Sequence, residues 1–206
     1  FIPIKGKKKD GHMFIQEALK KKAAFSVSSN QNVKLIKGKI FSVKNTYTFL
    51  NSLATEKRLS SNASIIGVTG SSGKTFVKEI LGKYLKLFGD TYYSPRSFNN
   101  HYGVPISLCN LEKTHKFGIF EIGMSYPGEI NKLSKIIKPH IGIITNVAEA
   151  HIENFQNLDG IARAKGEIIN NISKNGFLII DRDGKYFRYF EKIAVKKGLT
   201  VISFGF

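Results

Sequence analysis

The stretch Ser64-Ile-Ile-Gly-Val-Thr-Gly-Ser-Ser-Gly-Lys-Thr-Phe76 decides the fold of this 206-residue chain. Residues 64–68 are apolar and mostly β-branched, which predicts a buried strand. A glycine-containing loop follows, and apolar residues then recur from 77 to 88 at the spacing of one helix face. The order of strand, loop with Gly-Lys-Thr, and helix is typical of a phosphate-binding loop.

The residue types in this loop suit phosphate chemistry. Its glycines allow backbone angles that turn consecutive N–H groups toward phosphate oxygens, and the helix N-terminus adds partial positive charge. Lys74 can reach the β- and γ-phosphates, and the Thr75 hydroxyl can bind Mg²⁺. The loop departs from the common form at Val68, where a glycine usually stands, so a merely flexible loop is the alternative. We expect ATP to bind through Gly70, Ser71, Ser72, Gly73, Lys74 and Thr75.

Composition narrows the class of partner and compartment. The formal net charge of +17 favours anionic partners such as nucleotides, nucleic acid or acidic membrane surfaces. The lysine clusters at 5–9 and 20–22 are not interleaved with aromatic residues, which favours solvated faces over a groove for single-stranded nucleic acid. One cysteine, Cys109, fits a reducing compartment, and we expect a cytoplasmic protein. No apolar run approaches 18 residues, so no membrane span is predicted.

The two ends of the sequence have the pattern of interrupted strands. The chain begins Phe1-Ile-Pro-Ile4 without an initiator Met or a signal peptide, and it ends in the apolar run 199–204. We therefore interpret the sequence as a fragment of a longer protein.

Two α/β domains are predicted. Residues 1–62 have strand patterns at 1–4, 23–27, 33–36 and 40–43, a helix face over 14–19, and a second helix capped by Asn45. The polar stretch 56–62 marks the boundary. In 63–206, strands at 64–68, 90–93, 117–122, 140–146, 176–180 and 199–204 alternate with helices at 74–88, 103–111, 128–137, 158–172 and 184–197. This alternation predicts a mononucleotide-binding domain with a mostly parallel sheet and helices on both faces.

Ligands of such sheets bind beyond the carboxyl ends of the strands, where several polar residues stand. Glu121 ends one strand and can hold a metal that bridges ATP phosphates. Asp181 ends another, but the irregular loop 123–128 after Glu121 favours Glu121. His151 follows a third strand. At such a position a histidine can be a metal ligand, a substrate contact or a structural residue.

Two further motifs leave alternatives open. The amides of Asn99 and Asn100 precede a helix and can bind a polar ligand or merely cap the helix. Lys165 lies on a predicted helix, and its spacing alone indicates a surface lysine.

Taken together, these stretches resemble the Mur ligase family. The matching stretches cover nearly the whole chain: 1–6 with 10–12, 69–75, 99–105, 121–130, 146–151 and 164–167. The Ser-Ser form of the phosphate loop, the Asn-Asn-x-x-Gly-Val-Pro turn and Ala-Lys-Gly-Glu favour the family member that adds a dipeptide.

The resemblance implies a ligase of peptidoglycan precursor synthesis that uses ATP and Mg²⁺. ATP phosphorylates the terminal carboxylate of UDP-N-acetylmuramoyl-tripeptide, and the amine of D-alanyl-D-alanine attacks the acyl phosphate. Metal and lysine are needed because the attacking carboxylate and the γ-phosphate are both anions. The 1–62 domain is expected to hold the UDP moiety.

The resemblance also assigns site residues. Lys74, His151 and Lys165 are the implied catalytic residues, and Lys165 is carried as a carbamate that binds metal. The implied metal ligands are Thr75, Glu121, His151 and Lys165, and the implied precursor contacts are Asn99 and Asn100.

The family's amine-binding domain and the later part of its central domain are missing here, so the fragment is expected to be inactive alone. We expect a monomer that binds no nucleic acid. The alternatives are a ligase that adds a single amino acid, a folylpolyglutamate-type enzyme, a P-loop nucleotide switch, or a basic nucleic-acid-binding module. The switch is disfavoured because the pair Asn131-Lys132 lacks the Asp of a guanine-reading motif.

Overall fold

The computed structural model describes residues 1–6, 8–150 and 152–206, which form two compact units, Phe1–Leu53 and Ala54–Phe206. This division falls inside helix α2 (Thr46–Leu59). The polar residues 56–59, at which the sequence predicts the start of a linker, are therefore the last turn of that helix.

The first unit is small and held by few strands. It contains the 3₁₀ turn η1 (Gly11–Phe14), helix α1 (Ile15–Lys20) and two parallel strands, β1 (Ser26–Ser28) and β2 (Ile40–Ser42). The His12 ring lies 2.6 Å from the Asp10 carboxylate and accepts the Ser29 amide at 3.1 Å, which joins the turn before η1 to the end of β1. The predicted cap is confirmed, because the Thr48 amide donates to Asn45 Oδ1 at 2.9 Å.

The strands predicted at 1–4 and 33–36 are wrong. Phe1 lies beside β1 through two backbone hydrogen bonds, which are too few to extend the sheet. Leu35 and Ile36 are 54% and 40% exposed and follow a turn. Within the described residues neither stretch forms a ladder of hydrogen bonds with a neighbouring strand. Apolar β-type residues form a strand only where such a ladder exists.

The second unit is built on a six-stranded parallel sheet, as predicted. The strand order is β4-β5-β3-β6-β7-β8, and every neighbouring pair is parallel. The bounds are β3 (Ser64–Thr69), β4 (Thr91–Tyr93), β5 (Phe117–Glu121), β6 (Ile141–Ile144), β7 (Phe177–Asp181) and β8 (Thr200–Phe204).

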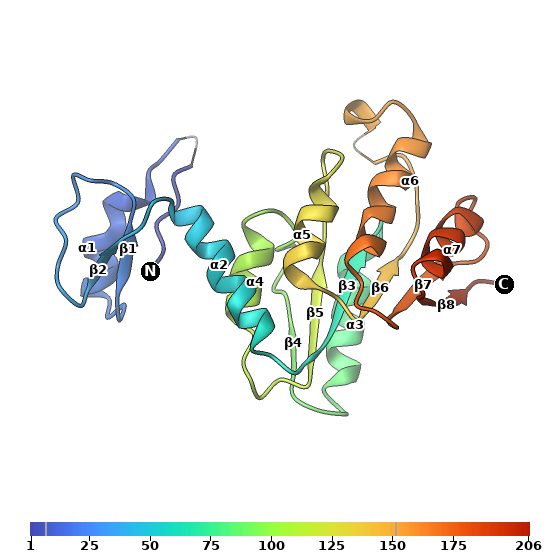
Figure 1. Cartoon of the computed structure of the whole chain (residues 1–206), viewed down its shortest axis with the longest axis horizontal. Helices are drawn as coiled ribbons and strands as arrows, with labels where there is room; N and C mark the ends of the chain where they lie inside the picture. The colour runs from blue at the N-terminus through green and yellow to red at the C-terminus, as the bar shows by residue number, and fades with distance from the viewer. Residues whose placement is uncertain (7, 151) are drawn as a thin grey trace. The chain divides into compact units, whose positions relative to one another are not determined.

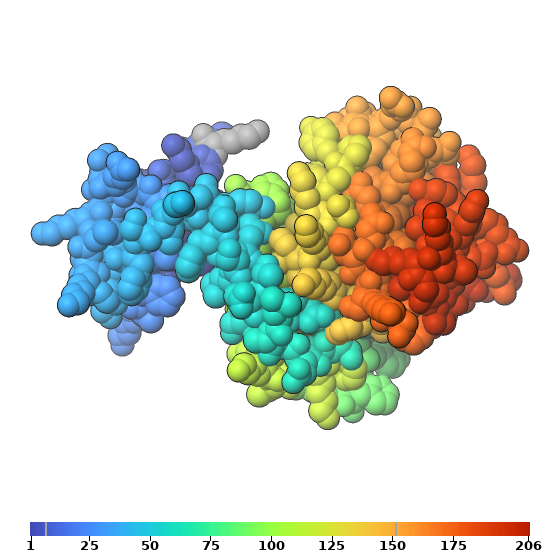
Figure 2. Space-filling model, in the orientation of Figure 1, coloured from blue at the N-terminus to red at the C-terminus, as the bar shows by residue number. Residues whose placement is uncertain are grey.

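Helices cover both faces of this sheet. Because successive side chains of a strand point to opposite faces, Ile65 and Ile66 of β3 belong to different cores. The Ile66 core packs against α3 (Lys74–Leu85). The Ile65 core packs against α4 (Gly103–Cys109), α5 (Glu129–Ile137), α6 (Leu158–Gly166) and α7 (Phe187–Lys196). Figure 1 shows α5, α6 and α7 following one another along the sheet, and in Figure 2 their atoms form one continuous surface.

The chain first runs from β3 to one edge of the sheet and then back across it. After β3 it crosses through α3 to the edge strand β4, whereas each later crossover leads back toward and past β3. The loops after β3, β5 and β6 therefore open side by side at the carboxyl edge of the central strands, where ligands of such sheets bind. The predicted helix 158–172 is divided into α6 and the 3₁₀ turn η3 (Glu167–Asn171), and η2 (Ile152–Asn154) precedes it. None of the described helices has the length and apolar character needed to span a membrane.

Candidate active site

The glycines of residues 70–73 shape the turn between β3 and α3. Gly70 has φ 147° and Gly73 has φ 77°, values that side chains disfavour. A Cβ on Gly70 would lie 1.8 Å from Thr145 Oγ1, so a side chain has no room there. The predicted order of strand, glycine loop and helix is confirmed.

Two backbone amides of the loop converge on the side chain of Asn146, which follows β6. The amides of Ser71 and Ser72 donate to Asn146 Oδ1 at 3.1 and 3.0 Å, and Asn146 Nδ2 donates to Ser72 Oγ at 2.7 Å. Amides that share one oxygen in this way have the orientation that binds a phosphate oxygen. The sequence analysis assigns Asn146 no separate role, because this contact depends on β6 lying beside β3.

Lys74 and Thr75 begin α3 and face different partners. Lys74 Nζ donates to the carbonyl oxygens of Gly70 and Ser71 at 2.8 and 3.2 Å. Burial lowers the pKa of Lys74, and the Glu121 carboxylate acts in the opposite direction. Thr75 Oγ1 donates to Glu121 Oε2 at 2.8 Å.

Glu121 is a buried carboxylate between two neutral donors. It is 1% exposed, and its Oε1 accepts Asn99 Nδ2 at 2.7 Å while its Oε2 accepts Thr75. Among the described residues no ammonium or guanidinium group donates to it. A carboxylate has about four acceptor positions, so Glu121 retains capacity for a cation. The competing Asp181 instead accepts the Asp183 amide at 3.0 Å, within its own turn.

Asn99 and Asn100 have different roles. Asn99 reaches Glu121, and its carbonyl oxygen accepts the Gly123 amide at 2.8 Å. Asn100 Oδ1 accepts the amides of Tyr102 and Gly103 at 3.1 and 2.9 Å, so its side chain caps the start of α4.

Lys165 is not the surface lysine that its spacing indicated. It is 2% exposed on α6, between the buried residues Ala164 and Gly166. Its amine has no hydrogen bond to a described residue. Burial, and to a lesser extent the charge of Lys74, lower the pKa of Lys165 to about 7.

The end of α6 is fixed by Glu167, a residue that sequence reasoning gave no separate role. Its carboxylate oxygens accept the amides of Gly128 and Asn131 at 2.7 and 2.9 Å. These amides lie at the start of α5, where a carboxylate is favourable. Glu167 therefore fixes the helix that carries Lys165 to the loop that follows Glu121.

The residues around Glu121 fit a hard divalent cation. The Thr75 hydroxyl and the Glu121 carboxylate are oxygen donors of the kind that Mg²⁺ prefers. Within the described part of the chain no three His, Cys, Asp or Glu side chains gather into a metal site. A complete site therefore needs a further donor, and His151, one of the predicted ligands, lies outside the described residues.

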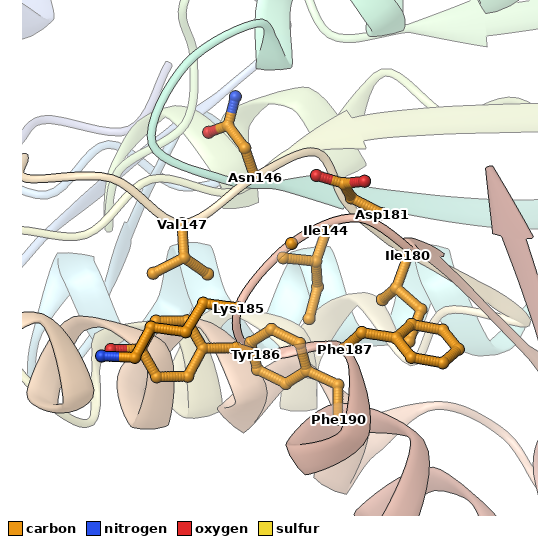
Figure 3. A pocket seen from close by; sticks show the side chains of 10 residues that line it. Ile144, Asn146, Val147, Ile180, Asp181, Lys185, Tyr186, Phe187 and Phe190 are labelled. Atoms are coloured by element: carbon orange, nitrogen blue, oxygen red, sulfur yellow. The ribbon is translucent and has the colours of Figure 1, made fainter. Parts of the chain in front are cut away.

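A pocket of about 70 Å³ lies beside the loop residue Asn146. Figure 3 shows Asn146 and Asp181 at one edge of this pocket and the aromatic side chains of Tyr186 and Phe190 opposite them. Asn146 therefore both binds the amides of the phosphate loop and lines this pocket.

Comparison with known proteins identifies the family of the chain. Residues 68–206 match the family described as the Mur ligase middle domain. The UDP-N-acetylmuramoyl-tripeptide--D-alanyl-D-alanine ligase of Buchnera aphidicola subsp. Baizongia pistaciae is 38% identical to this chain over an alignment of 213 residues. The aligned part covers 98% of this chain and 46% of that protein. The ligase of the same name from Escherichia coli is 35% identical, over 89% of this chain and 40% of that protein. The chain thus spans less than half the length of these relatives.

A solved structure shows the same fold. The MurF ligase of Thermotoga maritima, crystallised in complex with ADP, superposes with a TM-score of 0.86 and 34% identity, covering 100% of this chain and 47% of that one. Sequence and fold agree, and the chain belongs to the Mur ligase family.

Proposed function

We propose that the chain acts in an ATP-dependent ligase that adds D-alanyl-D-alanine to UDP-N-acetylmuramoyl-tripeptide in the synthesis of peptidoglycan precursors. The proposal is supported by relatives of that name, 34–40% identical over most of this chain. The observation that carries it is the meeting of Thr75, Asn99 and the buried Glu121 carboxylate beside the phosphate loop.

The residues divide the work of acyl phosphate formation. The amides of Ser71 and Ser72 and the ammonium of Lys74 hold the phosphates of ATP. Thr75 and Glu121 hold Mg²⁺, which when bound screens the charge of the γ-phosphate and of the approaching carboxylate. Asn99 orients the muramyl precursor. The precursor carboxylate attacks the γ-phosphorus and ADP leaves; the dipeptide amine then attacks the acyl carbon, and phosphate leaves.

Lys165 contributes as a carbamate in this proposal. Only a neutral amine attacks CO₂, and with a pKa of about 7 roughly half of the Lys165 side chains are neutral at pH 7. As the Lys165 nitrogen bonds to the CO₂ carbon it gives up a proton to solvent, and the resulting anion would supply the oxygen donor that Thr75 and Glu121 lack. His151 is proposed as a further ligand.

The first part of the chain is proposed to bind the UDP end of the precursor. The net charge of +17 suits a protein whose two large substrates, ATP and the UDP-linked precursor, are polyanions. The proposed place of action is the cytoplasm, and the proposed form is a monomer that binds no nucleic acid.

Turnover by the full-length enzyme tests the function. ADP and phosphate release should require both UDP-N-acetylmuramoyl-tripeptide and D-alanyl-D-alanine. Lys74→Ala should abolish turnover, and Glu121→Gln should lower it at least a hundredfold, while Lys83→Ala on the exposed side of α3 serves as the matched control. Full activity of Lys74→Ala would exclude the site. Acceptance of a single amino acid in place of the dipeptide would favour another ligase of this family.

A further inference from the structure

Lys78 is among the largest fully buried side chains of the described residues, with 0% exposure. It lies on α3, one turn after Thr75. Burying an ammonium group is costly unless the surroundings supply hydrogen-bond acceptors. A lysine at this place therefore requires an explanation beyond packing, because an apolar residue of similar length would fill the space at lower cost.

The acceptors all come from nearby backbone and one side chain. Lys78 Nζ donates to the carbonyl oxygens of Ser94 and Arg96 at 2.7 and 2.5 Å, and it lies 3.1 Å from Glu79 Oε1. An ammonium group has three donors, so each is matched by one acceptor. The two carbonyl groups belong to the segment between β4 and α4.

This segment, residues 94–99, needs to be held in place. Arg96 has φ 48°, a left-handed conformation that a residue other than glycine adopts only under constraint. At its start, the Ser94 amide donates to the carbonyl oxygen of Ile119 at 3.0 Å. Lys78 binds the carbonyl oxygens of Ser94 and Arg96, on either side of residue 95. It thereby stabilises the turn at Arg96.

The far end of the segment is Asn99, which returns to the same helix. Asn99 Nδ2 donates to Glu121 Oε1, and Glu121 Oε2 accepts Thr75, three residues before Lys78 on α3. Residues 94–99 are thus fixed to α3 at both ends, directly by Lys78 and indirectly through Glu121. Movement of the Lys78 end would shift the amide that Asn99 places on Glu121.

We propose that Lys78 is a positioning residue that sets the place of Asn99, and through it the binding of the muramyl precursor. This inference rests on the proposed function, in which Asn99 contacts the muramyl precursor. It assigns Lys78 no contact with ATP or with the reacting atoms.

A double-mutant cycle in the full-length enzyme tests the inference. Lys78→Met should raise the KM for UDP-N-acetylmuramoyl-tripeptide at least tenfold and leave the KM for ATP within twofold. If Lys78 acts through Asn99, the double variant Lys78→Met/Asn99→Ala should be no more than twofold worse than Asn99→Ala alone. Lys78→Arg, which keeps charged donors, should recover part of the loss. Lys83→Met, an exposed lysine of the same helix, should behave as the unmodified enzyme.

Several outcomes would overturn the inference. Multiplying effects in the double variant, or an equal rise of the KM for ATP and for the precursor, would show that Lys78 only stabilises the domain. If Lys78→Met does not fold, Lys78→Arg and Lys78→Arg/Asn99→Ala form the same cycle, and multiplying effects there count equally against it.

Hydrogen exchange separates this inference from the proposed function. If the unmodified enzyme does not ligate the proposed substrates, the function is wrong. The amides of Phe98 and Asn99, which donate to carbonyl oxygens within the segment, should still exchange at least tenfold faster in Lys78→Arg than in Lys83→Met. Equal exchange in the two variants would overturn the positioning role whatever the enzyme's substrate is.

Discussion

Carbamate formation at Lys165 gives the most quantitative test of the site. With a pKa of about 7, roughly half of the Lys165 side chains are neutral at pH 7, whereas about 0.03% of ordinary lysines with a pKa of 10.5 are neutral. The reactive fraction is therefore higher by a factor of roughly 1,500. At a fixed concentration of dissolved CO₂, the rate of carbamate formation follows the neutral fraction, so it should increase about tenfold per pH unit below pH 6 and level off above pH 8.

The assay is ¹³C NMR of the enzyme in ¹³C-labelled bicarbonate, with Lys165→Ala as the blank and the exposed Lys174→Ala as the matched control. One carbamate resonance should disappear in Lys165→Ala and persist in Lys174→Ala. Lys165→Ala should also lose most turnover, and added short-chain carboxylic acids should restore part of it by occupying the vacated space. The absence of a resonance that depends on Lys165 at pH 8, together with an active Lys165→Ala enzyme, would refute the reasoning.

The same pKa determines how stability depends on pH in the absence of CO₂. The folded pKa of about 7 lies below the ordinary 10.5, so between these values the unfolded chain binds the extra proton and stability increases with pH. The slope from this group is about 1.4 kcal/mol per pH unit, and the full penalty below pH 7 is roughly 5 kcal/mol. Lys165→Met should remove that penalty. Urea unfolding of the two proteins at pH 6.5 and pH 10 measures it, and equal pH dependence would contradict the burial argument.

Two further predictions concern the phosphate loop. Asn146→Asp should place a carboxylate on the Ser71 and Ser72 amides that phosphate needs. Because each charged hydrogen bond is worth about 1.5–3 kcal/mol, ADP binding should weaken by roughly 10- to 100-fold without a loss of thermal stability. Unchanged ADP affinity by calorimetry would contradict this role. Gly70→Ala should destabilise the protein more than Gly73→Ala. Both glycines have positive φ, but only a Cβ added at Gly70 would lie 1.8 Å from Thr145 Oγ1. Equal urea midpoints of the two variants would show that the loop adjusts freely.

The sheet could be predicted from the sequence because its strands are continuous apolar runs bounded by loops. Buried parallel strands such as β3 and β6 need apolar side chains on both faces, which makes their pattern unmistakable. In the first unit the apolar runs are short, and whether Val33–Ile36 finds a partner depends on the surrounding tertiary structure. The polar ends of β3 and β5 could likewise be predicted as site positions, since parallel strands bring their carboxyl ends to one edge.

The side-chain contacts within the site could not be predicted in the same way. Asn146 acts through the register of β6 beside β3, and no local pattern records that pairing. Lys165 is buried because α6 packs on the sheet between α5 and α7 (Figure 1), with Gly166 against Phe190, and a helix covered on several sides has no polar face to reveal its lysine. The resemblance to a family drew attention to Lys165 where periodicity did not.

Three lysines around this site show why residue type alone does not fix a role. A chain with 32 basic residues favours an exposed position for any one lysine, yet Lys78 and Lys165 are both buried. The difference between them is the supply of acceptors: Lys78 has two carbonyl oxygens and a carboxylate, whereas Lys165 has no hydrogen bond to a described residue and has the half-buried Lys74 as a charged neighbour. A buried amine with acceptors, such as Lys78, can hold a loop through its hydrogen bonds. Without such acceptors, burial lowers the pKa of Lys165 to about 7, and the neutral amine present there is the form that the proposed carbamate requires.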